Sequence, residues 1–203
     1  MNKNENIIIF AKVPGIGIAK SRIAETEGRD VADCIYRELL KETAGQVDGF
    51  EYHVAYTGAA DPGELKQYFS HAKGFFRQEG HNLGDRLKHA FRYIFDKGYK
   101  SVCAVGCDCP AMQREDLEEA FHFLNHDCDT VIGPALDGGY YLIGCNPHSS
   151  AALSAKQWSS ANLLTETLGI IFANGFTIHL LPSHPDIDRI NDYRKWKKQL
   201  LAA

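Results

Sequence analysis

The sequence predicts a three-layer α/β/α sandwich in which helices cover both faces of a mostly parallel, mixed central sheet. Short runs rich in β-branched and aromatic residues alternate with longer segments that repeat apolar residues every three or four positions. The alternation continues along the whole chain without an internal repeat, a low-complexity tract or a linker. Because strands and helices that alternate in this way build parallel sheets covered on both faces, a Rossmann-like architecture is expected.

Length and charge narrow the possibilities further. The chain has 203 residues, so residues 1–203 are expected to form a single domain. Its formal net charge of −4 argues against a general binder of nucleic acid or of anionic membranes. No apolar run approaches the roughly 18 residues of a membrane span, and the N-terminal segment lacks the pattern of a signal peptide. We therefore expect a cytoplasmic protein whose six cysteines are reduced, buried thiols.

The strands are predicted from short apolar runs that end at turn-forming residues. The run NIIIFA ends before Pro14 and Gly15, and the run KSVCAVG ends before Asp108 and Pro110. The segment FEYHVAYT is rich in the aromatic and β-branched residues that favour strands. The predicted strands cover residues 6–11, 50–57, 75–76, 100–106, 129–135, 140–145 and 176–181.

The helices are predicted from apolar residues that recur on one face. Leu83, Leu87, Phe91 and Ile94 form one such stripe, and Asp30 precedes another as an expected N-cap. The predicted helices cover residues 30–47, a second helix that begins at Asp61 and Pro62, residues 82–97, 113–125 and 160–173, and a final helix through Ile190, Tyr193, Trp196 and Leu200. In open sheets of this kind ligands bind at the carboxyl ends of the strands, so the candidate binding residues are expected in the segments that follow the strands.

The first strand is followed by AKVPGIGIAKSR, which concentrates positive charge next to glycine. Lys12, Lys20 and Arg22 flank Gly15 and Gly17, and glycine lets backbone N–H groups approach a phosphate closely. The segment lacks the glycine spacing of a P-loop and of a dinucleotide fingerprint. It predicts either a phosphate-binding loop or an ordinary surface turn with solvated lysines.

Asp108 follows the predicted strand 100–106 and precedes Pro110. A carboxylate at a strand end suits Mg²⁺, which prefers one or two carboxylates together with phosphate oxygens and water. The alternative is an aspartate that caps the next turn. A zinc site at Cys103, Cys107 and Cys109 is rejected, because the spacing contains no C-x-x-C pair and no second pair follows.

Two later segments add carboxylates and glycines at strand ends. Asp137, Gly138 and Gly139 separate two predicted strands and form either a hairpin turn or a glycine-opened edge against which a ligand lies. Asp186 and Asp188 follow the last strand and share one face if the chain is extended there, although Asp188 also suits an N-cap of the final helix.

The segment QEGHNLGDR supplies further candidates. Gln78 precedes the predicted helix 82–97 and Gly84 falls in its first turn. Arg86 is either a clamp for phosphate or carboxylate or an exposed helix charge.

Together these segments resemble a known family. The blocks FAKVPGIGIAKSRI, QEGHNLGDRL, VGCDCPAM, GPALDGGYYLIG and PDIDRINDY, in this order, resemble the bacterial glycosyltransferase-like proteins of the nucleotide-diphospho-sugar transferase (GT-A) superfamily. The layout is similar also to the molybdenum-cofactor and phospholactate guanylyltransferases. The resemblance implies a GT-A-type fold and a metal site at Asp108 with Asp186 or Asp188. It implies phosphate or nucleotide binding at Lys12, Gly15, Gly17, Lys20, Arg22, Gln78, Gly84, Arg86, Gly138 and Gly139.

The expected activity is a metal-dependent transfer from a nucleotide-sugar donor to a small acceptor, with Mg²⁺ or Mn²⁺ as cofactor. The acceptor is expected to be small because the chain lacks the long acceptor-binding region of large glycosyltransferases. Asp108, Lys20 and Asp137 are the expected catalytic residues, with Asp137 as the candidate general base. Two alternatives remain open, a nucleotidyltransferase that releases pyrophosphate from a nucleoside triphosphate and a nucleotide-binding protein without catalysis.

Overall fold

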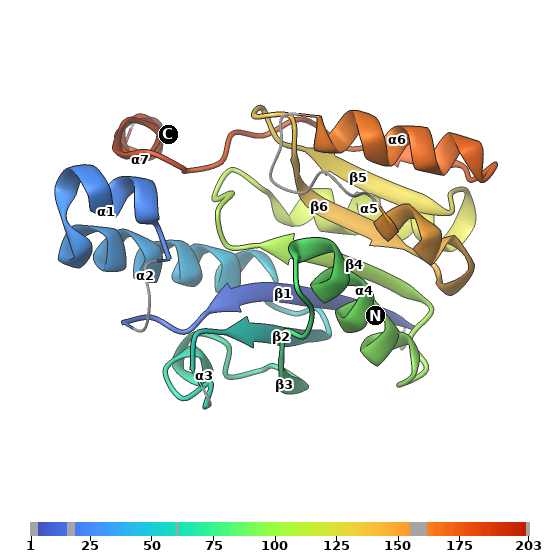
Figure 1. The fold of residues 1–203 in the computed structure, drawn as a ribbon, viewed down its shortest axis with the longest axis horizontal. Helices are drawn as coiled ribbons and strands as arrows, with labels where there is room; N and C mark the ends of the chain where they lie inside the picture. The colour runs from blue at the N-terminus through green and yellow to red at the C-terminus, as the bar shows by residue number, and fades with distance from the viewer. Residues whose placement is uncertain (1–3, 16–18, 60, 155–161, 202–203) are drawn as a thin grey trace.

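The computed structural model describes residues 4–15, 19–59, 61–154 and 162–201, and these residues form one seven-stranded sheet of order β3-β2-β1-β4-β6-β5-β7 (Figure 1). The strands are β1 (Glu5–Lys12), β2 (Tyr52–Thr57), β3 (Gly74–Arg77), β4 (Ser101–Gly106), β5 (Thr130–Pro134), β6 (Tyr140–Cys145) and β7 (Ile178–Leu180). Strand β6 runs antiparallel to β4 and β5, and the other neighbours pair in parallel. The predicted α/β class with a mixed sheet is confirmed.

Helices cover both faces of this sheet (Figure 1). They are α1 (Ser21–Glu27), α2 (Arg29–Gln46), α3 (Leu65–Tyr68), α4 (Leu83–Phe95), α5 (Arg114–His126), α6 (Leu163–Ala173) and α7 (Ile190–Leu200), with a 3₁₀ helix η1 (Pro147–Ser154). Helices α2, α3 and α5 pack into one apolar cluster, and α4, α6 and η1 pack into a second cluster on the opposite face. None of the described helices has the length and apolar character needed to cross a membrane.

The two apolar clusters follow from the alternation of side chains along the strands. In β1, Ile7, Ile9 and Ala11 contribute to the cluster with α2 and α5, whereas Ile8 and Phe10 contribute to the cluster with α4. A strand buried on both faces needs apolar residues at every position, which explains why NIIIFA reads as a continuous apolar run.

Helices α1 and α7 pack beside the sandwich rather than on the sheet (Figure 1). They form a third apolar cluster with α2, in which Ile23, Ile35 and Leu39 are buried and Trp196 is half-buried. Helix α1 and the 3₁₀ helix η1 are absent from the sequence-based assignment. The expected cap at Asp30 is wrong: α2 begins at Arg29 behind Gly28, where a positive φ of 91° suits glycine. Residues 160–161 of the predicted helix 160–173 lie outside the described residues.

A close contact between two strands fixes the end of the sheet where the site lies. A Cβ atom on Gly133 would lie 2.4 Å from Cζ of Tyr141, because the Tyr141 ring covers the glycine. The Tyr141 hydroxyl donates to the Pro182 carbonyl at 3.2 Å. The glycine on β5 therefore sets the position of an aromatic ring on β6.

Candidate active site

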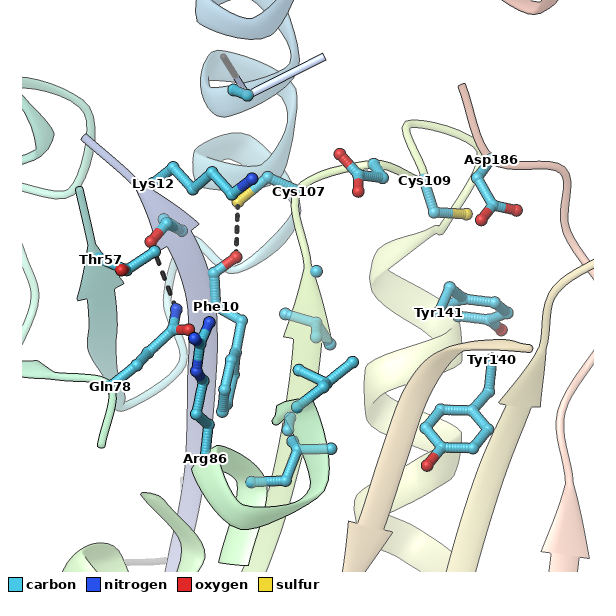
Figure 2. A pocket seen from close by; sticks show the side chains of 18 of the residues that line it. Phe10, Lys12, Thr57, Gln78, Arg86, Cys107, Cys109, Tyr140, Tyr141 and Asp186 are labelled. Atoms are coloured by element: carbon cyan, nitrogen blue, oxygen red, sulfur yellow. Dashed lines mark hydrogen bonds between the residues drawn. The ribbon is translucent and has the colours of Figure 1, made fainter. Parts of the chain in front are cut away.

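A cavity of about 510 Å³ opens at the carboxyl ends of β1, β2 and β4, where the antiparallel β6 presents its amino-terminal end (Figure 2). Figure 2 shows Lys12, Gln78 and Arg86 toward one end of this cavity and Tyr140, Tyr141 and Asp186 toward the other. The predicted site residues that line it are Lys12, Gln78, Arg86, Asp108 and Asp186. The cavity thus collects segments from both ends of the chain at the edge where open α/β sheets bind ligands.

The structure brings Lys20 and Asp108 together beside this cavity. The ammonium Nζ of Lys20 lies 2.5 Å from Asp108 Oδ1 and 2.5 Å from the carbonyl oxygen of Ile187. The Lys20 side chain is 5% exposed, whereas that of Asp108 is 59% exposed. A second link joins the same segments, because the Ile187 N–H donates to the Asp108 carbonyl at 2.8 Å. The buried lysine therefore ties the loop after β1 to the loops after β4 and β7.

Asp186 shares the cavity with Asp108 and feels the charge of Asp137 at the turn nearby. Burial, together with the negative charges of Asp137 and Asp108, raises the pKa of Asp186 to about 6. This repulsion is the electrostatic condition that a bound cation relieves. Among the described residues, no three His, Cys, Asp or Glu side chains lie close enough to hold a metal ion by themselves. Asp108 and Asp186 therefore fit a divalent ion that also takes oxygen ligands from phosphate and water.

Arg22 and Asp188 do not line the cavity. They form an ion pair with each other, and each side chain is about half exposed. Asp188 is not the N-cap of α7 either: Arg189 holds that position, and the Asp192 carboxylate accepts from the Arg189 N–H at 2.7 Å. The Arg22–Asp188 pair joins α1 to the segment that carries Asp186, so it braces the site from outside.

Two cations line the cavity without an ion pair to any described carboxylate. Lys12 is exposed at the end of β1, and Arg86 on α4 makes only a hydrogen bond from Nε to the Gly80 carbonyl, at 3.3 Å. Lys20, in contrast, is already neutralised by Asp108. Lys12 and Arg86 are thus the cations available to an anionic ligand.

Gln78 presents a fixed hydrogen-bond acceptor to the cavity. Its Nε2 donates to the carbonyl of Ala55 at 2.9 Å and to the carbonyl of Ala11 at 3.4 Å. Because carbonyl oxygens only accept, these contacts assign the orientation of the amide and leave Oε1 for a ligand.

The loop after β1 is anchored by α2 through residues that sequence analysis missed. The Tyr36 hydroxyl accepts from the Lys12 N–H at 2.7 Å and donates to the Lys12 carbonyl at 3.1 Å. Asp33 Oδ1 accepts from the Gly15 N–H at 2.9 Å. Polar residues three positions apart on an otherwise apolar helix face were the available signal for this anchor. Gly17 lies outside the described residues.

The glycine segment between β5 and β6 forms a turn. Gly138 has a positive φ of 92°, and the Gly139 N–H donates to Asp137 Oδ1 at 2.8 Å. Asp137 is exposed at this turn and does not line the cavity, although its charge acts on Asp186. Gly84 is buried in the first turn of α4, also outside the cavity lining.

The cysteines near Asp108 are neutral thiols. Burial raises the pKa of both Cys107 and Cys109 to about 12. Both line the cavity, but a protonated thiol is a poor nucleophile and a poor metal ligand. The expectation of buried thiols is wrong for Cys34, which is exposed, and for Cys128, which is half-buried.

A family comparison assigns the chain to a bacterial protein family. Residues 39–160 match the model of a family described as "Uncharacterized protein conserved in bacteria (DUF2064)". The chain belongs to this family. No curated protein sequence matches it.

Solved structures extend the comparison. A "putative nucleotide-diphospho-sugar transferase" from Desulfovibrio desulfuricans G20 is 31% identical, with a TM-score of 0.85 over 94% of this chain and 84% of that one. A cytidylyltransferase from Leptospira borgpetersenii is 14% identical, with a TM-score of 0.62 over 97% and 86% of the two chains. The Rv0371C protein of Mycobacterium tuberculosis H37Rv, solved in complex with manganese, is 11% identical, with a TM-score of 0.58 over 95% and 97%. The expected resemblance to the nucleotide-diphospho-sugar transferase fold is confirmed.

Proposed function

We propose that this chain is a divalent-metal-dependent transferase that moves a sugar from a nucleotide-sugar donor to a small acceptor. One observation carries the proposal: Asp108 and Asp186 line the same cavity as the unpaired cations Lys12 and Arg86. Such a cavity can bind a metal ion at its carboxylates and phosphate at its cations, as a metal–nucleotide complex requires. The similarity to the Desulfovibrio transferase-like protein supports the same conclusion.

In this proposal the roles follow from position and charge. Asp108 and Asp186 hold Mg²⁺ or Mn²⁺, which supplies Lewis-acid stabilisation of the negative charge on the leaving phosphate. Lys12 binds the phosphates of the donor, Arg86 is a second cation in the same cavity for an anionic group of either substrate, and Lys20 keeps Asp108 oriented toward the cavity. Asp188 is left out of the metal site because it pairs with Arg22 outside the cavity.

In the proposed transfer, the acceptor oxygen forms a bond to the anomeric carbon of the sugar, and the bond between that carbon and the phosphate oxygen breaks. The nucleoside diphosphate leaves with the electron pair, and the proton of the acceptor passes to a carboxylate base. We propose Asp137 as that base, because its charge acts on the cavity carboxylate Asp186; since Asp137 lies on the turn outside the cavity lining, the role requires this turn to approach the bound acceptor.

Thermal shifts and product analysis test the proposal. Wild-type protein is heated with nucleoside diphosphates and nucleotide sugars, with and without Mn²⁺, alongside Asp108→Asn and the control Asp30→Asn on an exposed part of α2. Stabilisation by the metal–nucleotide pair should disappear in Asp108→Asn and persist in Asp30→Asn. Equal stabilisation of all three proteins contradicts the metal assignment.

The product identifies the reaction. Release of nucleoside diphosphate from a nucleotide sugar supports the glycosyltransferase. Release of pyrophosphate from a nucleoside triphosphate supports the nucleotidyltransferase, the alternative that the fold shared with a cytidylyltransferase favours. Binding without either product supports a non-catalytic nucleotide-binding protein.

A further inference from the structure

One part of the cavity has no assigned ligand. Lys12, Asp108 and Asp186 serve the nucleotide and the metal in the proposed function. The part here called the apolar bay is lined by Phe10, Leu83, Leu87, Ala104, Tyr140 and Ile143. These residues come from β1, α4, β4 and β6, on the face of the sheet that α4 covers.

The apolar bay offers almost no side-chain partner for hydroxyl groups. Its single polar side-chain atom is the hydroxyl of Tyr140, which already has an interaction within the protein. Burial also raises the pKa of that hydroxyl, so the group stays neutral. A polyhydroxylated ligand would lose hydrogen bonds to water here without replacement, which is costly. An apolar ligand would gain by burying its surface.

A glycine leaves the floor of the bay open. Gly106 ends β4 two positions after Ala104, so both residues face the α4 side of the sheet. Apart from its chain neighbours, the one described atom within 4 Å of a Cβ on Gly106 would be the Asp108 nitrogen, at an ordinary contact distance of 3.9 Å, so a side chain there would meet little other protein. Any side chain at this position would occupy the bay beside the metal-binding carboxylate.

Positive charge lies at the border of the bay. Figure 2 shows Phe10 and Arg86 toward one end of the cavity and Tyr140 toward the other, and all three residues line it. Arg86 has no carboxylate partner among the described residues and follows Leu83 on the same helix. A ligand that fills the bay with an apolar group can therefore place an anionic group against Arg86.

We propose that the apolar bay binds the acceptor, and that this acceptor is a small molecule with an apolar, ring-sized body and an anionic phosphate or carboxylate group. The role of this ligand as an acceptor rests on the proposed function. The preference for an apolar, anionic ligand rests on the residues of the bay alone. It names a substrate class for the second substrate and rejects free sugars as its occupants.

Direct binding measurements without nucleotide test the preference. Phenyl phosphate, glucose 1-phosphate and inorganic phosphate are titrated into wild-type protein by calorimetry. Phenyl phosphate should bind about tenfold more tightly than inorganic phosphate, since burying the ring adds apolar contact. Glucose 1-phosphate should bind no more tightly than inorganic phosphate. Glucose 1-phosphate binding as tightly as phenyl phosphate, or phenyl phosphate no tighter than inorganic phosphate, overturns the proposal.

Substitutions that fill the apolar bay test whether phenyl phosphate binds there. Gly106→Val places two methyl groups in the open space and should reduce phenyl phosphate affinity about tenfold or more, with a smaller loss for Gly106→Ala. Gly45→Val is the matched control, because Gly45 is exposed on α2 and a Cβ at this position would have open space around it. Unchanged phenyl phosphate affinity in folded Gly106→Val overturns the proposal. So does an equal loss in Gly45→Val.

The two proposals fail separately. A bay assigned correctly to the acceptor predicts that Gly106→Val keeps its thermal stabilisation by Mn²⁺ and nucleoside diphosphate. Loss of that stabilisation assigns the bay to the nucleotide instead and overturns the acceptor assignment. Absence of nucleotide binding in wild type refutes the proposed function, yet leaves the phenyl phosphate preference measurable.

Discussion

Acidification should destabilise the fold through one buried histidine at the end of the sheet opposite the site. His53 on β2 is 4% exposed, and its Nδ1 contacts Asn6 Oδ1 at 3.1 Å. Burial, together with the positive charges of Lys97 and Lys73 and against the opposing charge of Glu51, lowers the pKa of His53 to about 4. The imidazole is therefore neutral in the folded protein at neutral pH, with the Nδ1–H donated to Asn6.

The magnitude follows from the difference between the two states. In the unfolded chain the imidazole has its ordinary pKa of about 6.5. Between this pH and about pH 4, the imidazole is therefore protonated in the unfolded state and neutral in the folded state. The stabilising contribution is complete above pH 6.5 and is lost as the pH falls toward 4. A difference of about 2.5 pKa units corresponds to roughly 3 kcal/mol in the free energy of unfolding at pH 4.

Urea unfolding at several pH values measures this effect. His53→Asn keeps an amide donor near the position of Nδ1 but does not titrate. Between about pH 7.5 and pH 4, wild type should lose about 3 kcal/mol more unfolding free energy than the variant. Equal losses in the two proteins would show that His53 is not held neutral by the fold.

Three further substitutions test the site and its supports. Lys20→Met should weaken binding of nucleoside diphosphates more than binding of nucleosides in a titration with Mn²⁺, because the buried ammonium orients Asp108, the proposed ligand of the metal that binds the phosphates; equal losses refute this. Gly133→Ala should lower the unfolding free energy by about 1–3 kcal/mol, since its Cβ would displace the Tyr141 ring; an unchanged urea midpoint refutes the contact. Tyr36→Phe should cost about 1–3 kcal/mol in the same assay by leaving the Lys12 N–H without its partner, and wild-type stability would contradict it.

Much of the fold was predictable because each buried strand and helix carries its own periodic signal. The run NIIIFA identifies β1, and the stripe containing Leu87 and Phe91 identifies α4. Helix α1 was missed because its seven residues contain a single buried side chain, Ile23, which produces no periodicity. Its position depends on packing against α2 and α7, and such distant contacts leave no local pattern.

The sequence predicted which residues lie at the edge of the sheet that carries the site, but not which of them form ion pairs with one another. The strand-end rule and the family resemblance placed Asp108, Asp186 and Lys12 at the correct edge of the sheet. Neither could indicate that Lys20 would be neutralised by Asp108, because that contact depends on how two loops pack. The apolar bay was also missed, since Phe10 and Leu87 read as ordinary core residues until the glycine that leaves room beside them is seen in place.

The bridge from Lys20 to Ile187 also bears on biosynthesis. These partners are 167 positions apart, so all the residues between them must leave the ribosome before they can meet. Until then the ammonium of Lys20 lacks its backbone acceptor, and the segment that carries Asp186 has not docked. A nascent chain can assemble β1, β2 and β4 earlier, yet the cavity is completed only when the segment around Asp186 and Ile187 docks.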